Sequence, residues 1–140
     1  MNDCEAVVPV ECASCDGPAA ARVYETIIDG RLHWVLTHDC GDTFVEAMGW
    51  HETPDDLRQA LLDQCGMYRL RLSGEITGRV AVMRVLRRSG TSLADVPEAL
   101  AALTDPGRSG TEMELQLLAG RLRAAGASAT VERVRDATDG

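Results

Sequence analysis

Residues 20–37 read AARVYETIIDGRLHWVLT, and the pattern is that of a β-hairpin. β-Branched and aromatic residues dominate on both sides of Asp29-Gly30, a dipeptide typical of a two-residue type I′ turn because both residues tolerate positive φ. The stretch predicts strands over 20–28 and 31–37. A third short strand is predicted at Thr43-Phe44-Val45.

Cysteines flank the predicted hairpin on both sides. Cys12 and Cys15 form a C-x2-C pair before it, and Cys40 follows it beside His38. A hairpin that brings two such knuckles together is typical of a zinc ribbon, in which thiolates and imidazoles hold a structural Zn²⁺. The sequence therefore predicts a zinc-ribbon-like module with structural zinc held by Cys12, Cys15, His38 and Cys40.

Other interpretations of these cysteines stay open. Thr37 stands where an intact second knuckle has a thiolate, and His38 substitutes for it. Because H-x-C is a tight spacing for two ligands of one metal, His51 or Cys65 is an alternative fourth ligand. A ribbon that has lost its metal and a redox dithiol at the C-x2-C pair are two further interpretations. The cysteine count is five, an odd number, and no export signal is apparent, so a disulfide framework is not expected.

Charge divides the 140 residues into two parts. Residues 1–66 carry 13 acidic residues and 3 arginines, a net charge of −10, and residues 67–140 carry 9 acidic residues and 11 arginines, a net charge of +2. Such asymmetry predicts two modules with different partners. The overall charge of −8 disfavours nucleic-acid binding. No apolar run is long enough to span a membrane, and a cytoplasmic protein is expected.

The acidic module is expected to end in a helix. Thr53 is the predicted N-cap and Pro54 the first helical residue, and Leu57 and Leu61 share the apolar side. Cys65 on the last turn is interpreted as a small buried hydrophobe, and Trp50 and His51 before the helix as packing residues. The first domain is therefore predicted over residues 1–66.

The second half predicts a small α+β domain over residues 67–135, with a disordered tail at 136–140. A half-buried strand is expected at 67–72, because Tyr68, Leu70 and Leu72 alternate with arginines. Helices are expected at 79–88 with Thr77 as N-cap, from Asp95 with Glu98 completing a capping box, and over 111–125 behind a Thr111–Glu114 capping box. A last strand is expected at 127–134, which completes a strand, helix, helix, helix, strand order.

This half resembles the C-terminal domain of the bacterial ribosomal stalk protein, with Clp protease adapters as a weaker match. The residues that carry the resemblance are RVAVMRVLR at 79–87, the segment 90–100 and LRAAGA at 122–127. The resemblance implies a three-stranded sheet with three helices, a surface that recruits translation-factor GTPases, and no catalytic residues. Ser92 and Pro97 replace a glycine and a lysine of the family pattern. The absence of lysine from the whole chain points to a GC-rich bacterial genome.

A helical wheel separates residues 79–88 into two sides. The side expected to pack on the sheet holds Ala81, Val82, Val85 and Leu86. The opposite side holds the predicted partner-binding residues Val80, Arg84, Arg87 and Arg88, with Met83 at its edge. Arginine and methionine are enriched at protein interfaces, whereas a single exposed valine is also common on ordinary surfaces.

The chain is expected to be non-enzymatic, because no nucleophile–base spacing or phosphate loop stands out; Cys40 with His51 is the remaining catalytic candidate. The first functional hypothesis is an adapter or translation-associated accessory protein that binds another protein through the arginine-flanked helix. The alternative is an immunity-type inhibitor whose acidic first half neutralises a basic toxin.

Overall fold

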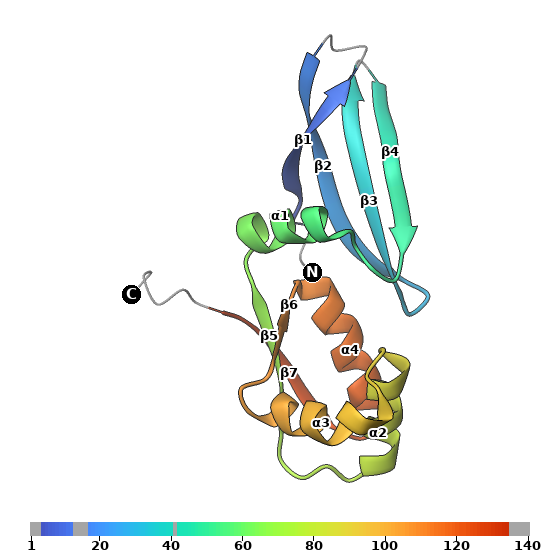
Figure 1. Ribbon diagram of the computed structural model, residues 1–140, viewed down its shortest axis with the longest axis vertical. Coiled ribbons are helices and arrows are strands. Elements are labelled where there is room, and N and C mark those ends of the chain that lie inside the picture. The colour runs from blue at the N-terminus through green and yellow to red at the C-terminus, as the bar shows by residue number, and fades with distance from the viewer. Residues whose placement is uncertain (1–3, 13–16, 41, 135–140) are drawn as a thin grey trace. The chain divides into compact units, whose positions relative to one another are not determined.

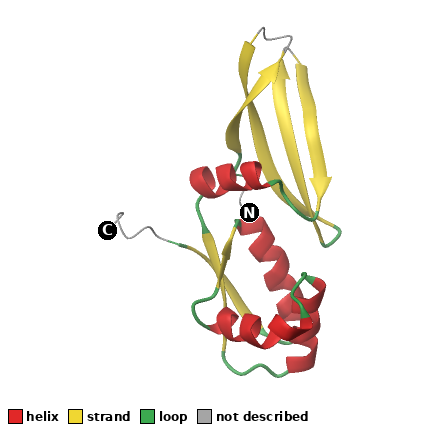
Figure 2. Cartoon of the chain, viewed as in Figure 1, coloured by secondary structure: helices red, strands yellow, loops and turns green. Residues whose placement is uncertain are grey.

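The computed structural model describes residues 4–12, 17–40 and 42–134, so the predicted tail at 136–140 lies outside the described residues. The chain forms two compact units, residues 1–66 and 67–140. Its described residues build a mixed α+β structure with two antiparallel sheets and four α-helices (Figures 1 and 2). None of the described helices is long and apolar enough to cross a membrane.

The first unit contains a four-stranded antiparallel meander in the order β1-β2-β3-β4. The strands are β1 (Ala6–Cys12), β2 (Gly17–Ile28), β3 (Arg31–Cys40) and β4 (Asp42–Trp50). The predicted hairpin is confirmed, because Asp29 and Gly30 have φ values of 51° and 72° at the turn between β2 and β3. The sequence predicted three strands in this unit, but the sheet has four. Strand β1 was not predicted, and β4 is nine residues long and extends beyond the predicted strand at Thr43-Phe44-Val45.

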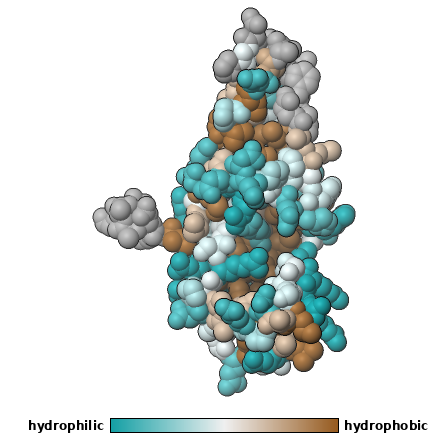
Figure 3. Space-filling view, in the orientation of Figure 1, coloured by the Kyte–Doolittle hydropathy of each residue, from teal (hydrophilic) through white to brown (hydrophobic). Residues whose placement is uncertain are grey.

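Helix α1 (Asp55–Cys65) packs on one face of this sheet (Figure 1). Leu57 and Leu61 are buried against apolar residues of β1 and β2: Ala6, Val8, Ala21 and Val23. Replacing a buried leucine by alanine typically destabilises a domain by about 2–5 kcal/mol, so this contact is a main source of the unit's stability. Hydrophobic residues stay visible on the strands beyond the helix, which therefore covers only part of the face (Figure 3).

The predicted Thr53 cap of α1 was wrong. Pro54 occupies the N-cap position, and no side chain caps the helix. Thr53 is buried, and its hydroxyl instead donates to Oε2 of Glu25 at 2.5 Å. A buried carboxylate requires a hydrogen-bond donor, and the chain leaving β4 supplies one from Thr53.

The structure joins Cys4 and Cys65 in a disulfide, with a Cα–Cα distance of 5.9 Å. The interpretation of Cys65 as a small buried hydrophobe was therefore wrong, and the chain holds one disulfide although no disulfide framework was expected. The two residues are 61 positions apart, and only the packing of α1 on β1 brings the end of the helix to the start of the strand. The spacing of the cysteines along the sequence therefore does not predict that Cys4 and Cys65 lie close together.

The second unit has a three-stranded antiparallel sheet in the order β6-β5-β7. Its elements are β5 (Tyr68–Ser73), α2 (Arg79–Arg88), the 3-10 helix η1 (Leu93–Asp95), α3 (Val96–Thr104), β6 (Arg108–Gly110), α4 (Glu112–Ala124) and β7 (Ser128–Arg133). Leu70 and Leu72 of β5 are buried in a core shared with all three α-helices, as their alternation predicted. The residue pattern did not predict the short strand β6. The described part of this unit has the three strands and three α-helices implied by the stalk-domain resemblance, which itself stays a prediction.

Only one of the helix caps predicted in this unit forms. Thr111 Oγ1 accepts from the Glu114 amide at 3.3 Å while the Glu114 carboxylate accepts from the Thr111 amide at 3.0 Å, which confirms that capping box. Thr77 does not cap α2, because its hydroxyl donates to the Gly126 carbonyl. Asp95 does not cap α3, because its carboxylate accepts from the Ser92 hydroxyl at 2.8 Å. Nearby hydrogen-bond donors and acceptors thus replace the expected caps.

Reducing the disulfide is expected to destabilise the first unit alone. A cross-link that closes a loop of 61 positions lowers the entropy of the unfolded chain, which corresponds to about 4 kcal/mol of stability. Calorimetry of the full chain with and without a phosphine reductant should show one transition moving to lower temperature. The transition of residues 67–140 serves as the internal control, because that unit has no cysteine. An unchanged thermogram after complete reduction would contradict the prediction.

Candidate functional site

The outer face of α2 presents the predicted partner-binding residues to solvent. Val80 is 65% exposed, and Arg84, Arg87 and Arg88 are also exposed. Met83 is partly buried and packs against the core of the second unit. We call the four solvent-exposed residues Val80, Arg84, Arg87 and Arg88 the α2 surface.

Packing on the opposite side sets the rotation of α2. Val82 and Leu86 are fully buried in the core, which leaves Val80 and Arg84 on the outer side. Gly78, just before the helix, lies so close to the end of α4 that an added Cβ would approach the Ala125 carbonyl oxygen to 2.4 Å. A side chain at residue 78 would therefore force the start of α2 away from α4.

The α2 surface is cationic. Helix α2 contains no acidic residue in its first turn. Its last turn holds Arg87 and Arg88, and the negative end of the helix dipole stabilises their positive charges. Within the described part of the chain, no carboxylate forms an ion pair with Arg84, Arg87 or Arg88. The dipole gives a structural reason for the last two arginines but none for Arg84 or for the exposed valine beside it.

The predicted zinc ligands lie toward one end of the first sheet. Cys12 ends β1, Cys40 ends β3, and His38 precedes Cys40 on β3; Cys15 lies outside the described residues. His38 is buried, and its Nδ1 lies 2.9 Å from the Ala20 carbonyl oxygen. Because a carbonyl only accepts, Nδ1 of His38 donates to it, and Nε2 is the ring nitrogen that a metal would use.

The spacing of the strands limits how these residues could share a metal. Strand β2 lies between β1 and β3, so β1 and β3 are about 10 Å apart. Zinc–sulfur bonds are about 2.3 Å long, so Cys12 and Cys40 could share one ion only where the ends of β1 and β3 curve toward each other. No group of three or more metal-ligand side chains occurs among the residues described.

The structure contradicts both alternative fourth zinc ligands, Cys65 and His51. Cys65 is bonded to Cys4, so its sulfur is not a thiolate. His51 follows the other end of β4, where its amide donates to the Leu32 carbonyl, and about 30 Å of strand separates it from the end that holds Cys40. The same distance removes the catalytic pairing of Cys40 with His51.

An aromatic group on the first sheet was missed by the sequence analysis. Trp50 was interpreted as a packing residue, but it is 41% exposed at the end of β4. The His33 ring lies 4.3 Å from it between centroids, and the Arg31 guanidinium lies 4.8 Å from its ring centroid. Gly49 interrupts the run of strand-forming residues before Trp50, so the sequence gives little sign of a strand there. A glycine is required at this position because an added Cβ would approach Nε1 of Trp34 to 2.6 Å.

Tyr68, at the start of β5, has a phenol whose pKa is shifted by its surroundings. Burial raises the pKa of its phenol above 10.0, and the Glu112 carboxylate adds to the rise through its charge and a hydrogen bond, while Arg133 opposes it. Tyr68 begins β5 and Glu112 begins α4, so this pair joins the sheet to a helix. We assign it a structural role.

No family model matches this chain, and neither a curated protein nor a solved structure was found to be similar to it.

Replacing Tyr68 with phenylalanine is expected to change how stability depends on pH. The raised pKa means that the neutral phenol stabilises the fold fully below about pH 10 and that this stabilisation is lost as pH rises through the folded-state pKa. At pH 8 the variant should be less stable than the wild type, because it lacks the neutral phenol that this site favours. Urea unfolding from pH 8 to 11 should show this gap closing; a constant gap would contradict the assignment.

Proposed function

We propose that this chain is a non-enzymatic protein-binding adapter that acts through the α2 surface. The observation that carries the proposal is Val80, 65% exposed and flanked by exposed arginines on a helix whose opposite side is fully packed. An apolar contact surrounded by arginines is typical of interface composition. The resemblance to the stalk domain, in which a surface recruits translation-factor GTPases, supports the same use of this helix.

The chemistry of the α2 surface defines its partner. Arg84, Arg87 and Arg88 can pair with carboxylates in a bidentate geometry, and Val80 offers a small apolar contact. The partner is therefore an acidic protein surface with an apolar side chain at its centre. Opposite charges also accelerate association, so binding should weaken and slow as salt increases.

An immunity-type inhibitor is the second candidate, and the charge of the first unit favours it. Residues 1–66 carry a net charge of −10, and no lysine or arginine occurs between Arg31 and Arg58. An acidic protein of this kind captures a basic enzyme rapidly. In this alternative, the first unit makes the contact with the partner.

Charge reversal on α2 is expected to abolish binding without unfolding the protein. Arg84→Glu and Arg87→Glu each place an anion opposite a partner carboxylate, so a loss of several kcal/mol in binding free energy is expected. Both side chains point to solvent, so stability should change by about 0.5 kcal/mol or less. The measurement is affinity capture with mass spectrometry to obtain the partner, followed by calorimetry of each variant.

Two variants separate the candidate functions. Arg108→Glu makes the same charge change on exposed β6 and should bind like the wild type. Asp42→Arg reverses a charge in β4 of the acidic unit. If Asp42→Arg loses the partner while Arg84→Glu keeps it, the adapter proposal is wrong and the inhibitor is preferred.

We also propose that the first unit binds structural zinc through Cys12, Cys15, His38 and Cys40. The orientation of the His38 ring and the positions of Cys12, His38 and Cys40 toward one end of the sheet support the proposal. Zinc bound there would hold together the ends of β1 and β3, and its binding free energy would add to the stability of the unit.

The zinc proposal predicts about one zinc ion per chain in protein purified without chelators. Cys12→Ser and Cys40→Ser should each lower both the metal content and the melting temperature of the first unit. Cys4→Ser is the control, since it removes the disulfide without removing a proposed ligand. Elemental analysis that finds no metal in freshly purified protein would contradict the proposal.

A cytoplasmic location stays part of this proposal. The reducing cytoplasm keeps thiols reduced, whereas oxidising compartments preserve disulfides. The compartment therefore determines how much of the protein carries the Cys4–Cys65 bond.

A further inference from the structure

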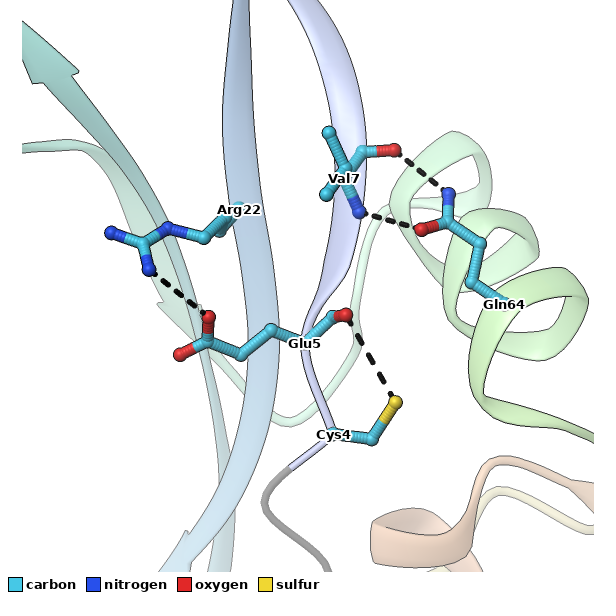
Figure 4. Close-up of polar contacts among 5 residues, drawn as sticks. All are labelled: Cys4, Glu5, Val7, Arg22 and Gln64. Carbon is cyan, nitrogen blue, oxygen red and sulfur yellow. Dashed lines mark hydrogen bonds and ion pairs between the residues drawn. The ribbon is translucent and has the colours of Figure 1, made fainter.

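The two edges of the first sheet differ. The β1 edge is closed at Val7, whose amide donates to Oε1 of Gln64 while its carbonyl accepts from Nε2 of Gln64, both at 2.8 Å (Figure 4). The side-chain amide of α1 thus takes the place of a neighbouring strand. Pro9, two residues later, has no amide hydrogen to offer. Natural sheets protect their edges by such means.

The β4 edge has no such cover over Ala47–Trp50, the part of this strand whose side chains are described. The His51 amide donates to the Leu32 carbonyl, so the next opposed pair, His33 and Trp50, does not exchange ladder hydrogen bonds. The pair of Val35 and Met48 has the same geometry by the alternation of an antiparallel ladder. The amide and carbonyl of Met48 therefore point away from the sheet, toward a position that an added strand would occupy.

Apolar side chains stand beside this open backbone. Met48 is 62% exposed and Trp50 is 41% exposed, and their spacing of two residues places both on the same face of β4. Trp50 is held in place by the His33 ring and the Arg31 guanidinium, so its position is ordered before any partner binds. Methionine and tryptophan are common anchors at interfaces.

The charge around this edge selects the partner. Between Leu32 and Leu57 the chain has six acidic residues and neither lysine nor arginine; Arg31 flanks this stretch, with its guanidinium 4.8 Å from the Trp50 ring centroid, and acidic residues remain in excess. These residues form most of β3, all of β4 and the start of α1. A second copy of the chain would bring the same acidic residues to the contact, whereas a cationic segment would neutralise them.

We propose that the β4 edge at Ala47–Trp50 binds an extended, cationic segment of a partner protein as an added strand. Backbone hydrogen bonds to Met48 would supply the pairing, and apolar side chains at alternate positions of the segment would contact Met48 and Trp50. Basic side chains between them would meet the acidic surroundings. This surface is separate from the α2 surface and opposite in charge, so an adapter could hold two different partners.

Met48→Pro tests the backbone pairing directly. The Met48 amide makes no ladder bond with β3, so proline removes the outward donor while the sheet keeps its hydrogen bonds. The probes are two synthetic peptides of about ten residues, one alternating lysine with valine and one alternating glutamate with valine. Binding to the full chain is followed by tryptophan fluorescence and by backbone amide shifts in nuclear magnetic resonance spectra.

The lysine–valine peptide is expected to bind at least about tenfold more tightly than the glutamate–valine peptide, to shift the amides of residues 47–50 and to weaken with salt. Met48→Pro should lose about tenfold in affinity and keep the wild-type melting temperature within a few degrees. Met48→Ala, which keeps the amide and removes the anchor, should lose less. Arg84→Glu should bind the peptide like the wild type, so this test is independent of the α2 surface.

Three results would overturn the proposal. The first is equal binding of the two peptides, or no binding of either. The second is unchanged binding of the lysine–valine peptide by a folded Met48→Pro variant. The third is a wild-type dimer that Met48→Pro converts to a monomer, which would make a second copy of this chain the occupant of the edge.

Discussion

Helix α1 packs Leu57 and Leu61 against β1 and β2, and most other features of the first unit depend on this contact. The small residues Ala6 and Ala21 lie in the same core and leave room for the helix to approach the strands. Once α1 lies there, its last turn reaches the start of β1, where Cys65 meets Cys4. One apolar contact therefore determines both a covalent cross-link and the edge that the sheet leaves open.

The same contact makes the two edges of the sheet unequal. Gln64 satisfies the backbone of Val7 only because α1 runs beside β1, and the described residues of the first unit place no helix beside β4. An unpaired edge next to an exposed Met48 promotes association unless a partner covers it. The strong negative charge of the unit keeps copies of the chain apart while it attracts a basic partner.

The second unit presents a surface of the opposite charge. Burial of Val82 and Leu86 turns the arginines of α2 to solvent, and the absence of an acidic residue from that helix leaves their charges available for a partner. Because the net charges of −10 and +2 lie on separate compact units, each unit can attract a different protein. This division of charge supports the proposal of an adapter with two binding surfaces.

Local patterns in the sequence determined the elements whose signal lies within a few residues. The Asp29-Gly30 turn, the alternation of Leu70 and Leu72 and the capping box of Thr111 with Glu114 all formed as expected, because each depends on neighbours along the chain. The exposed and buried sides of α2 followed from its 3.6-residue period for the same reason.

Tertiary structure alone decided the features that join distant segments. The Cys4–Cys65 bond, the hydrogen bond from Thr53 to Glu25 and the Gln64 contact with Val7 each connect residues at least 28 positions apart. These residues become neighbours only after α1 has packed on the sheet and β4 has paired with β3. The spacing of residues along the sequence contains no information about that packing. For the same reason, the sequence does not show that Gln64 covers the β1 edge and that the β4 edge stays open.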